Sequence, residues 1–189
     1  MDRKSLLATA LAACICVPAF AAPVTFTIDP LHTYEHFSYQ HMGFSTQEFG
    51  FNKTSGTVTL DSAAHTGAVD VTIDATSLDA GSDLFNSHLR DEKFFDVAKY
   101  PTATFKSTSV QFDGDRPVSV EGDLTIKGVT KPVTLTVTDF KLGKNMMKKD
   151  AIGADATVTV KRSDFNLGAY VPMVSDDVKI TVALEASAK

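Results

Sequence analysis

Apolar side chains alternate with polar ones along most of the chain. Between residues 66 and 74 valine and isoleucine alternate with aspartate and threonine, and the same period of two recurs at 123–127, 133–138, 157–160 and 179–185. Because neighbouring side chains of a strand point to opposite faces, this pattern predicts half-buried antiparallel strands with one solvated face. Turn sequences such as Asp113-Gly114 and Lys127-Gly128 separate the runs. The predicted strands are residues 23–29, 34–41, 54–61, 67–74, 102–112, 117–127, 131–141 and 151–161, with a further one at 178–186.

One segment breaks this period. Residues 82–89 read SDLFNSHL, in which Ser82 or Asp83 can cap a helix and the apolar residues recur on one helical face. The pattern therefore predicts an all-β domain of about eight antiparallel strands, with a short helical excursion near residues 82–98. Such a domain can be a sandwich or a barrel. The interior of an eight-stranded barrel is either filled by side chains or holds one small ligand.

The first residues have the features of a secretory signal peptide. Arg3 and Lys4 precede a short apolar run, and Ala19-Phe20-Ala21 supplies a small-x-small cleavage pattern. We therefore expect residues 1–21 to be removed and residues 22–189 to form a single domain. An alternative is a lipoprotein, because Leu11-Ala12-Ala13-Cys14 resembles a bacterial lipobox in which Cys14 would be lipidated.

The net charge of the chain excludes some classes of binding partner. The formal net charge is −5, and removing the signal, which carries a net positive charge of one, makes the mature chain more negative. We expect no nucleic-acid partner, no electrostatic docking on anionic lipid and no stable membrane insertion of the mature chain.

Both cysteines, Cys14 and Cys16, lie in the signal, so a hydrophobic core must hold the domain together without a disulfide.

Phenylalanine is frequent and tryptophan is absent. The chain has 13 phenylalanines, of which Phe20 lies in the signal. Several of the others lie outside the predicted strands, where an aromatic side chain must still find a surface to pack against. The mouth and lumen of a barrel would provide one.

Five motifs together resemble the YceI-like family of bacterial periplasmic proteins. They are HMGFS (41–45), NKTSGTVTLD (52–61), HLRDEKFFDVAKYPTATFKSTSV (88–110), GDLTIKGVTKPVTLTV (122–137) and TVTVKRSDFNLG (157–168). The resemblance implies a lipocalin-like antiparallel barrel around a long apolar cavity, located in the periplasm. It also implies a bound polyisoprenoid, prenyl quinone or prenyl phosphate and no general catalytic activity. The segment 142–153 is shorter than the resemblance leads us to expect.

The resemblance and the aromatic content together predict a ligand site. Adjacent residues of a helical turn point about 100° apart, so we expect one of Phe94 and Phe95 to face the lumen and the other to pack behind it. His88 and Arg90 are the candidates for contact with a ligand headgroup, since a guanidinium can bind phosphate through two hydrogen bonds. The expected apolar lining is Phe37, Phe44, Phe49, Phe51, Leu89, Phe94, Phe95 and Phe105.

A metal site, an interaction module and an enzyme find less support in the sequence than a lipid-binding barrel. His32, His36 and His41 do not have the convergent spacing of a zinc site, and we expect neither a metal nor a catalytic residue. One alternative is an interaction module with a filled core, whose loops contact an envelope protein or a membrane-bound redox partner. A second alternative is a hydrolase-like enzyme that uses His88 and a nearby carboxylate. The sequence leaves a homodimer open.

Overall fold

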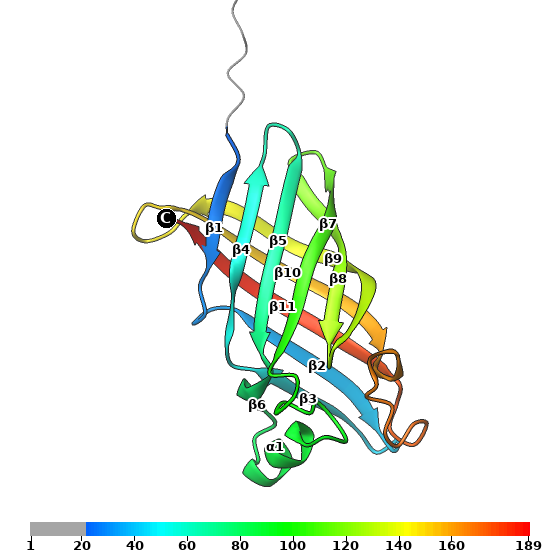
Figure 1. Ribbon diagram of the computed structural model, residues 1–189. Helices are drawn as coiled ribbons and strands as arrows, with labels where there is room; N and C mark the ends of the chain where they lie inside the picture. Colours follow the sequence, from blue (N-terminus) through cyan, green and yellow to red (C-terminus); the bar gives the residue numbers. More distant parts are fainter. Residues whose placement is uncertain (1–21) are drawn as a thin grey trace, which may run out of the picture.

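The computed structural model describes residues 22–189 (Figure 1). The expected signal peptide, its cleavage site and the alternative lipidation at Cys14 all lie outside the described residues. The elements are β1 Val24–Ile28, β2 Tyr34–His41, β3 Ser45–Phe51, β4 Thr54–Asp61, β5 Thr66–Asp74, η1 Ala75–Ser77, β6 Leu78–Asp79, α1 Asp83–Arg90, β7 Thr102–Asp113, β8 Arg116–Ile126, β9 Val129–Lys144, β10 Asp150–Lys161, η2 Arg162–Phe165 and β11 Asp177–Ala188.

Eight of the strands close into an antiparallel barrel, which confirms the predicted fold class. Their order is β1-β4-β5-β7-β8-β9-β10-β11, and β11 pairs back to β1. The ring is possible because β11 is long: its C-terminal part pairs with β1, while Lys179 to Ala183 pair with β2. A barrel closed in this way leaves no free edge around its circumference.

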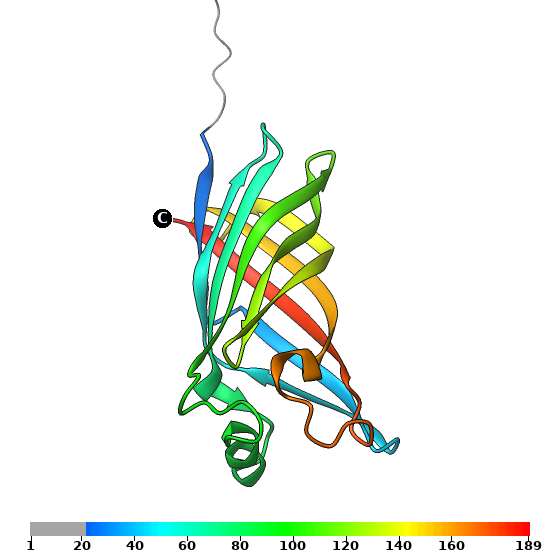
Figure 2. The same cartoon turned by 45° about the vertical axis from the view of Figure 1, so that its right-hand side comes forward.

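Strands β2 and β3 form a ribbon that extends the sheet beyond β11 at one end of the barrel (Figures 1 and 2). The two-residue strand β6 pairs with the end of β3. The prediction left out β3, because Ser45, Gln47 and Glu48 leave the segment without an alternating apolar row. The ribbon forms nevertheless, because β2 supplies its main-chain partners along its whole length.

The two ends of the barrel differ. The far end carries the β4–β5, β7–β8 and β9–β10 turns together with the C-terminus. The other end, which we call the mouth, carries the β2–β3 turn, α1, the β8–β9 turn and the loop 166–176 (Figures 1 and 2). The cover of the barrel interior is therefore built from irregular segments at the mouth.

Helix α1 leads into a segment of consecutive turns at residues 91–100, which we call the lid segment. The predicted helix is confirmed, with Ser82 as its N-cap residue but without a side-chain capping bond. Asn86 instead accepts from the amide of Ala80 at 2.6 Å, which fixes the turn before the helix. None of the helices within residues 22–189 is long and apolar enough to cross a bilayer.

Candidate functional site

A cavity of about 340 Å³ lies inside the barrel. Its size is within the range of about 300–1,000 Å³ that is usual for small-molecule sites. The interaction-module alternative expected a lumen filled by side chains, whereas this lumen is hollow. The walls are made by the inward-facing side chains of nearly every strand of the barrel, and most of these side chains are aliphatic.

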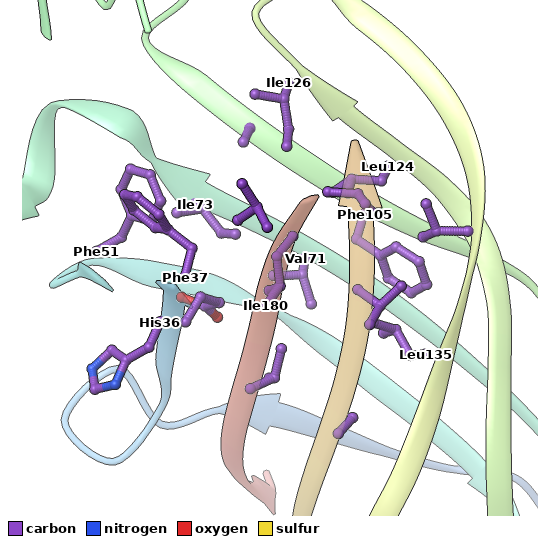
Figure 3. A pocket seen from close by; sticks show the side chains of 18 of the residues that line it. His36, Phe37, Phe51, Val71, Ile73, Phe105, Leu124, Ile126, Leu135 and Ile180 are labelled. Atoms are coloured by element: carbon purple, nitrogen blue, oxygen red, sulfur yellow. The ribbon is translucent and has the colours of Figure 1, made fainter. Parts of the chain in front are cut away.

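The aliphatic walls follow directly from the period of two. Inward-facing residues of neighbouring strands, among them Val71, Phe105 and Leu124, surround one space in Figure 3. On β7 the lining runs from Ala103 to Val110, which at roughly 3.3 Å per residue is about 23 Å along the strand. The cavity is thus long enough for an extended hydrocarbon chain. The other lining aliphatics shown and labelled are Ile73, Ile126, Leu135 and Ile180.

Three phenylalanines from separate segments meet on one wall of the cavity. The ring of Phe37 on β2 lies 5.8 Å from that of Phe51 on β3, and 5.8 Å from that of Phe95 in the lid segment. Phe51 and Phe95 are 5.6 Å apart, with their ring planes at 88°. Because Phe95 belongs to the lid segment, this cluster attaches the cover of the mouth to the β2–β3 ribbon.

Phe94 also lines the cavity, so the expectation that one of the two adjacent phenylalanines packs behind the other is wrong. The lid segment is not helical: the amide of Phe94 donates to Asp91 and that of Phe95 to Leu89. This path turns both rings toward the lumen at different depths. Phe94 contacts His88, with centroids 4.7 Å apart, and lies 6.3 Å from Tyr170 at the mouth.

Two of the expected lining residues lie elsewhere. Phe44 is 88% exposed in the β2–β3 turn and does not line the cavity. Phe49 lies outside the lining as well, where its ring supports those of Phe37 at 6.0 Å and Phe85 at 5.3 Å. The remaining expected residues do line the cavity: Phe37, Phe51, Leu89, Phe94, Phe95 and Phe105.

The two expected headgroup residues are separated by the structure. His88 lines the cavity at the mouth, between the rings of Phe85 and Phe94. Arg90 does not, because its guanidinium donates to the carbonyl of Leu78 and ties α1 to β6. Arg90 is thus placed outside the cavity lining, in a contact that holds α1 against β6.

The enzyme alternative finds no support in the contacts of His88. Within residues 22–189, no ion pair joins His88 to a carboxylate. The other histidines also separate: His32 lies 2.9 Å from Asp29, and His36 points to the outer face, 3.3 Å from Glu48. The described part of the chain holds no group of three or more side chains arranged to bind a metal ion.

Strand β2 brings polar groups to the lumen that the sequence analysis did not single out. Glu35, Phe37, Tyr39 and His41 alternate along its inner face, and His36 borders the cavity with its ring directed away from the other lining side chains (Figure 3). Glu35 is 6% exposed and accepts a hydrogen bond from the hydroxyl of Thr54. Burial raises the pKa of the Glu35 carboxyl, and the bond from Thr54 opposes that shift in part. The signal was present in the sequence, because a strand that turns Phe37 inward must also turn Glu35 inward.

Arg162 is a second charged residue in the lining. Its guanidinium donates to the carbonyls of Ser175 at 2.8 Å, Val174 at 2.9 Å and Leu167. Burial lowers the pKa of Arg162, and the nearby carboxylate of Asp176 opposes this. The donors of Arg162 are thus occupied in holding the loop 166–176 over the mouth.

The mouth is rimmed by exposed apolar side chains. The amide of Met42 donates to the carbonyl of Met173 at 3.0 Å, and His41 forms an isolated bridge with Val174. The β2–β3 turn and the loop 166–176 are thereby joined side by side (Figure 2). We call the exposed apolar residues of these two segments the mouth tip: Met42, Phe44, Tyr170, Val171 and Met173.

Comparisons with known proteins agree with this architecture. A family model described as the YceI-like domain matches residues 26–186. The protein YceI of Escherichia coli O157:H7 is 36% identical over 186 residues, which cover 97% of this chain and 97% of that protein. Protein YceI of Salmonella arizonae is 34% identical over the same length and coverage.

Solved structures show the same barrel. BcnA from Burkholderia cenocepacia superposes with a TM-score of 0.73 at 30% identity, covering 84% of this chain and 99% of that one. A polyisoprenoid binding domain from Saccharophagus degradans, implicated in plant cell wall breakdown, gives a TM-score of 0.67 at 19% identity. It covers 88% of this chain and 99% of that one, and at this identity the likeness shows a shared fold.

Proposed function

The chain belongs to the YceI-like family, and from this we propose that it is a binding protein that encloses a long-chain amphiphilic lipid in its barrel. A polyisoprenoid or a prenyl quinone is the class of ligand we favour. The observation that carries the proposal is the cavity of about 340 Å³, with its nearly continuous aliphatic and aromatic lining.

Burial without chemistry is sufficient for this function. Each methylene group that moves from water into the lumen contributes roughly 0.8 kcal/mol, so a chain of several isoprene units binds without any charged contact. The length of the lining along β7 suits an extended chain rather than a compact ligand. The ligand class is consistent with the Saccharophagus degradans domain, which is described as polyisoprenoid-binding.

We place the entrance at the mouth. His88, Phe94 and Tyr170 line the cavity there, and His88 and Tyr170 are polar lining residues that are also exposed to solvent. A headgroup would remain beside them while the chain occupies the lumen. His88 keeps the role expected from the sequence, and Arg90 does not share it.

The test is extraction of the protein from its native host, followed by mass spectrometry of the organic phase. A filled-lumen variant sharpens the result: Ala154→Trp places an indole inside the cavity, because Ala154 lines it. Ala183→Trp is the matched control, because Ala183 is exposed on the neighbouring strand β11. We expect a prenyl lipid with the wild type and Ala183→Trp but not with Ala154→Trp. Folded wild type that repeatedly carries no lipid and binds no long prenyl chain contradicts the proposal.

We further propose that the protein acts in the periplasm after removal of residues 1–21. The basic start, the short apolar run and the cleavage pattern of the sequence support this. Mass spectrometry of the mature protein should find Ala22 as its first residue. A diacylglyceryl group on Cys14 would instead establish the lipoprotein alternative.

A further inference from the structure

Glu35 is a buried acid in a cavity that is otherwise almost entirely apolar. It is 6% exposed, lines the lumen, and pairs along the sheet with Val182 of β11 and Phe51 of β3. Within residues 22–189, no lysine, arginine or histidine forms an ion pair with it. Its environment therefore supplies no ion-pair partner and little bulk water, and a positive charge on His36 is the weakest of the influences on its pKa.

The hydrogen-bonding capacity of Glu35 is only partly used. Thr54 donates to one carboxyl oxygen, whereas the two oxygens together offer about four acceptor positions. The other charged residue of the lining, Arg162, already donates to three carbonyls. Burying a polar group costs free energy unless it is paired, so a ligand that donates to Glu35 regains part of that cost.

We propose that Glu35 and Thr54 form a polar subsite inside the lumen, which recognises a hydrogen-bond donor on the ligand, either a hydroxyl or an amine. In its ionised form the subsite disfavours a carboxylate or a phosphate at the same position, because two groups of like charge repel each other there. The inference rests on the proposed function, since it requires a chain to occupy the cavity. It gives the lumen a chemical preference that its aliphatic walls cannot provide.

The test compares three ligands of equal chain length: dodecanol, dodecylamine and dodecanoate. Each displaces the neutral fluorescent probe N-phenyl-1-naphthylamine from wild type, Glu35→Leu, Glu35→Gln and the control Glu48→Leu. Glu48 is a suitable control because it lies on β3 with its side chain 61% exposed on the outer face. We expect the wild type and Glu48→Leu to bind the alcohol and the amine about tenfold more tightly than dodecanoate, as one hydrogen bond to a charged group predicts.

Glu35→Leu should bind dodecanoate at least as well as the other two ligands. Glu35→Gln should keep the alcohol and lose the advantage of the amine, and this variant decides the question if Glu35→Leu does not fold. Equal binding of all three ligands by the wild type, or an unchanged preference in Glu35→Leu or Glu35→Gln, overturns the subsite alone. A wild type that binds neither the probe nor any of the ligands overturns the proposed function as well.

The mouth tip supports a second, independent inference. Phe44 is 88% exposed, Met173 59%, Met42 51%, Tyr170 46% and Val171 38%. Exposed apolar side chains that gather in one place mark an interaction site, whereas scattered ones do not. Here they gather on two adjoining loops that project from the mouth end of the barrel (Figure 2).

The chemistry of the mouth tip fits a lipid surface. Residues 41–47 and 166–174 contain no aspartate, glutamate, lysine or arginine, in a chain with 22% charged residues. The tip is also continuous with the ligand site, because His41 and Tyr170 line the cavity. We infer that the mouth tip inserts into the surface of a lipid bilayer, so that an apolar chain passes between bilayer and lumen without crossing water.

Sedimentation with phosphatidylcholine vesicles tests this inference. We expect wild type to bind neutral vesicles with little dependence on salt, and the double substitution Phe44→Ser with Met173→Ser to weaken binding at least tenfold. The control is Met146→Ser with Met147→Ser: these residues are 103% and 72% exposed in the β9–β10 turn at the far end, beside Lys144 and Lys148.

Binding that is lost in the far-end control, or that requires anionic lipid, overturns the inference by assigning the membrane contact to the β9–β10 turn. Absence of binding to any vesicle overturns it too. So does a wild-type dimer that the mouth-tip variant dissociates in analytical ultracentrifugation, because the tip would then be an interface between two copies of the chain.

Discussion

Phe95 and Phe51 meet edge to face, with their ring centroids 5.6 Å apart and their planes at 88°. The pair joins the lid segment to β3, so its loss should loosen the cover of the barrel and also cost stability. We expect Phe95→Ala to lower the free energy of unfolding by about 2–3 kcal/mol, less than the 3–5 kcal/mol of a fully buried phenylalanine. Urea denaturation followed by circular dichroism measures this. A change within experimental error would mean that the lid segment is not held by this contact.

Phe94→Ala should behave differently, because Phe94 lies farther out, against His88 and Tyr170. Its removal opens the mouth without breaking the Phe37–Phe51–Phe95 cluster. We expect a smaller loss of stability, about 1 kcal/mol or less, and faster dissociation of a bound chain. Stopped-flow release of a fluorescent lipid gives the rate. If Phe94→Ala destabilises the fold as much as Phe95→Ala and leaves the release rate unchanged, the two positions have been assigned to the wrong roles.

A substitution of Arg90 distinguishes a role in holding the fold from a role in binding the ligand. Arg90→Ala leaves the carbonyl of Leu78 without its donor, and the side chain of Leu78 is fully buried. We expect a loss of about 1–3 kcal/mol in the free energy of unfolding, with ligand affinity changed less than twofold in the folded fraction. Thermal denaturation and ligand titration on the same preparation check both quantities. A large loss of affinity for an anionic headgroup at unchanged stability would restore the role expected from the sequence.

Glu35 should make stability depend on pH. The folded state raises the pKa of this carboxyl above its ordinary value of 4.5, mainly by burial, so the native protein retains a proton that the unfolded chain has released. Stability then falls as pH rises through the interval above that value. His36 lies beside Glu35 in sequence but faces outward to Glu48, so it compensates little. We expect the stability of Glu35→Gln relative to wild type to increase as pH rises from 4.5 upward, measured by urea denaturation. A difference that is constant over that range contradicts the burial of an ionisable Glu35.

Gly56 is required where the backbone of β4 lies unusually close to that of its sheet neighbour β5. Its φ is +150°, and a Cβ atom at this position would lie 2.1 Å from the carbonyl oxygen of Asp70. Neither the strand nor its partner can move without breaking the ladder. We expect Gly56→Ala to be severely destabilising, by more than about 3 kcal/mol, with Gly143→Ala as the control because a Cβ atom on Gly143 would meet nothing within 4 Å. Comparable thermal midpoints for the two variants would contradict the close approach at Gly56.

The alternating pattern predicted the antiparallel strands because each carries one wet and one apolar face, and the resemblance to the YceI-like family chose the barrel over the sandwich. The pattern did not predict β3, because an edge ribbon that is paired on one side needs no alternating apolar row. Phe44 was misplaced for a related reason: an aromatic residue in a loop was assumed to be packed, whereas this one is 88% exposed. One amino-acid sequence alone does not show whether a loop projects into solvent or packs against the barrel.

Glu35 shows a different limit. A charged residue in an alternating strand is normally assigned to the wet face, and in β2 both faces carry polar residues. The inward direction is set by pairing with β11 and β3, which are far away in sequence or were not predicted. His88 could be found because it belongs to a helical face with Phe85 and Leu89. Arg90 could not be excluded, since the carbonyl that it binds belongs to the unpredicted strand β6.

The wall and the cover of the barrel are held by different kinds of contact. Continuous main-chain ladders close the wall, whereas a few side-chain contacts fasten the cover, such as Lys93 to the hydroxyl of Tyr170 at 2.7 Å and Lys127 to the carbonyl of Glu92 at 2.8 Å. Local opening at the mouth therefore needs far less free energy than global unfolding. Amides of the lid segment should exchange with deuterium much sooner than those of β10 and β11. The residence time of a bound ligand and the lifetime of the folded barrel can consequently change independently. A barrel that unfolds slowly can still exchange its ligand quickly.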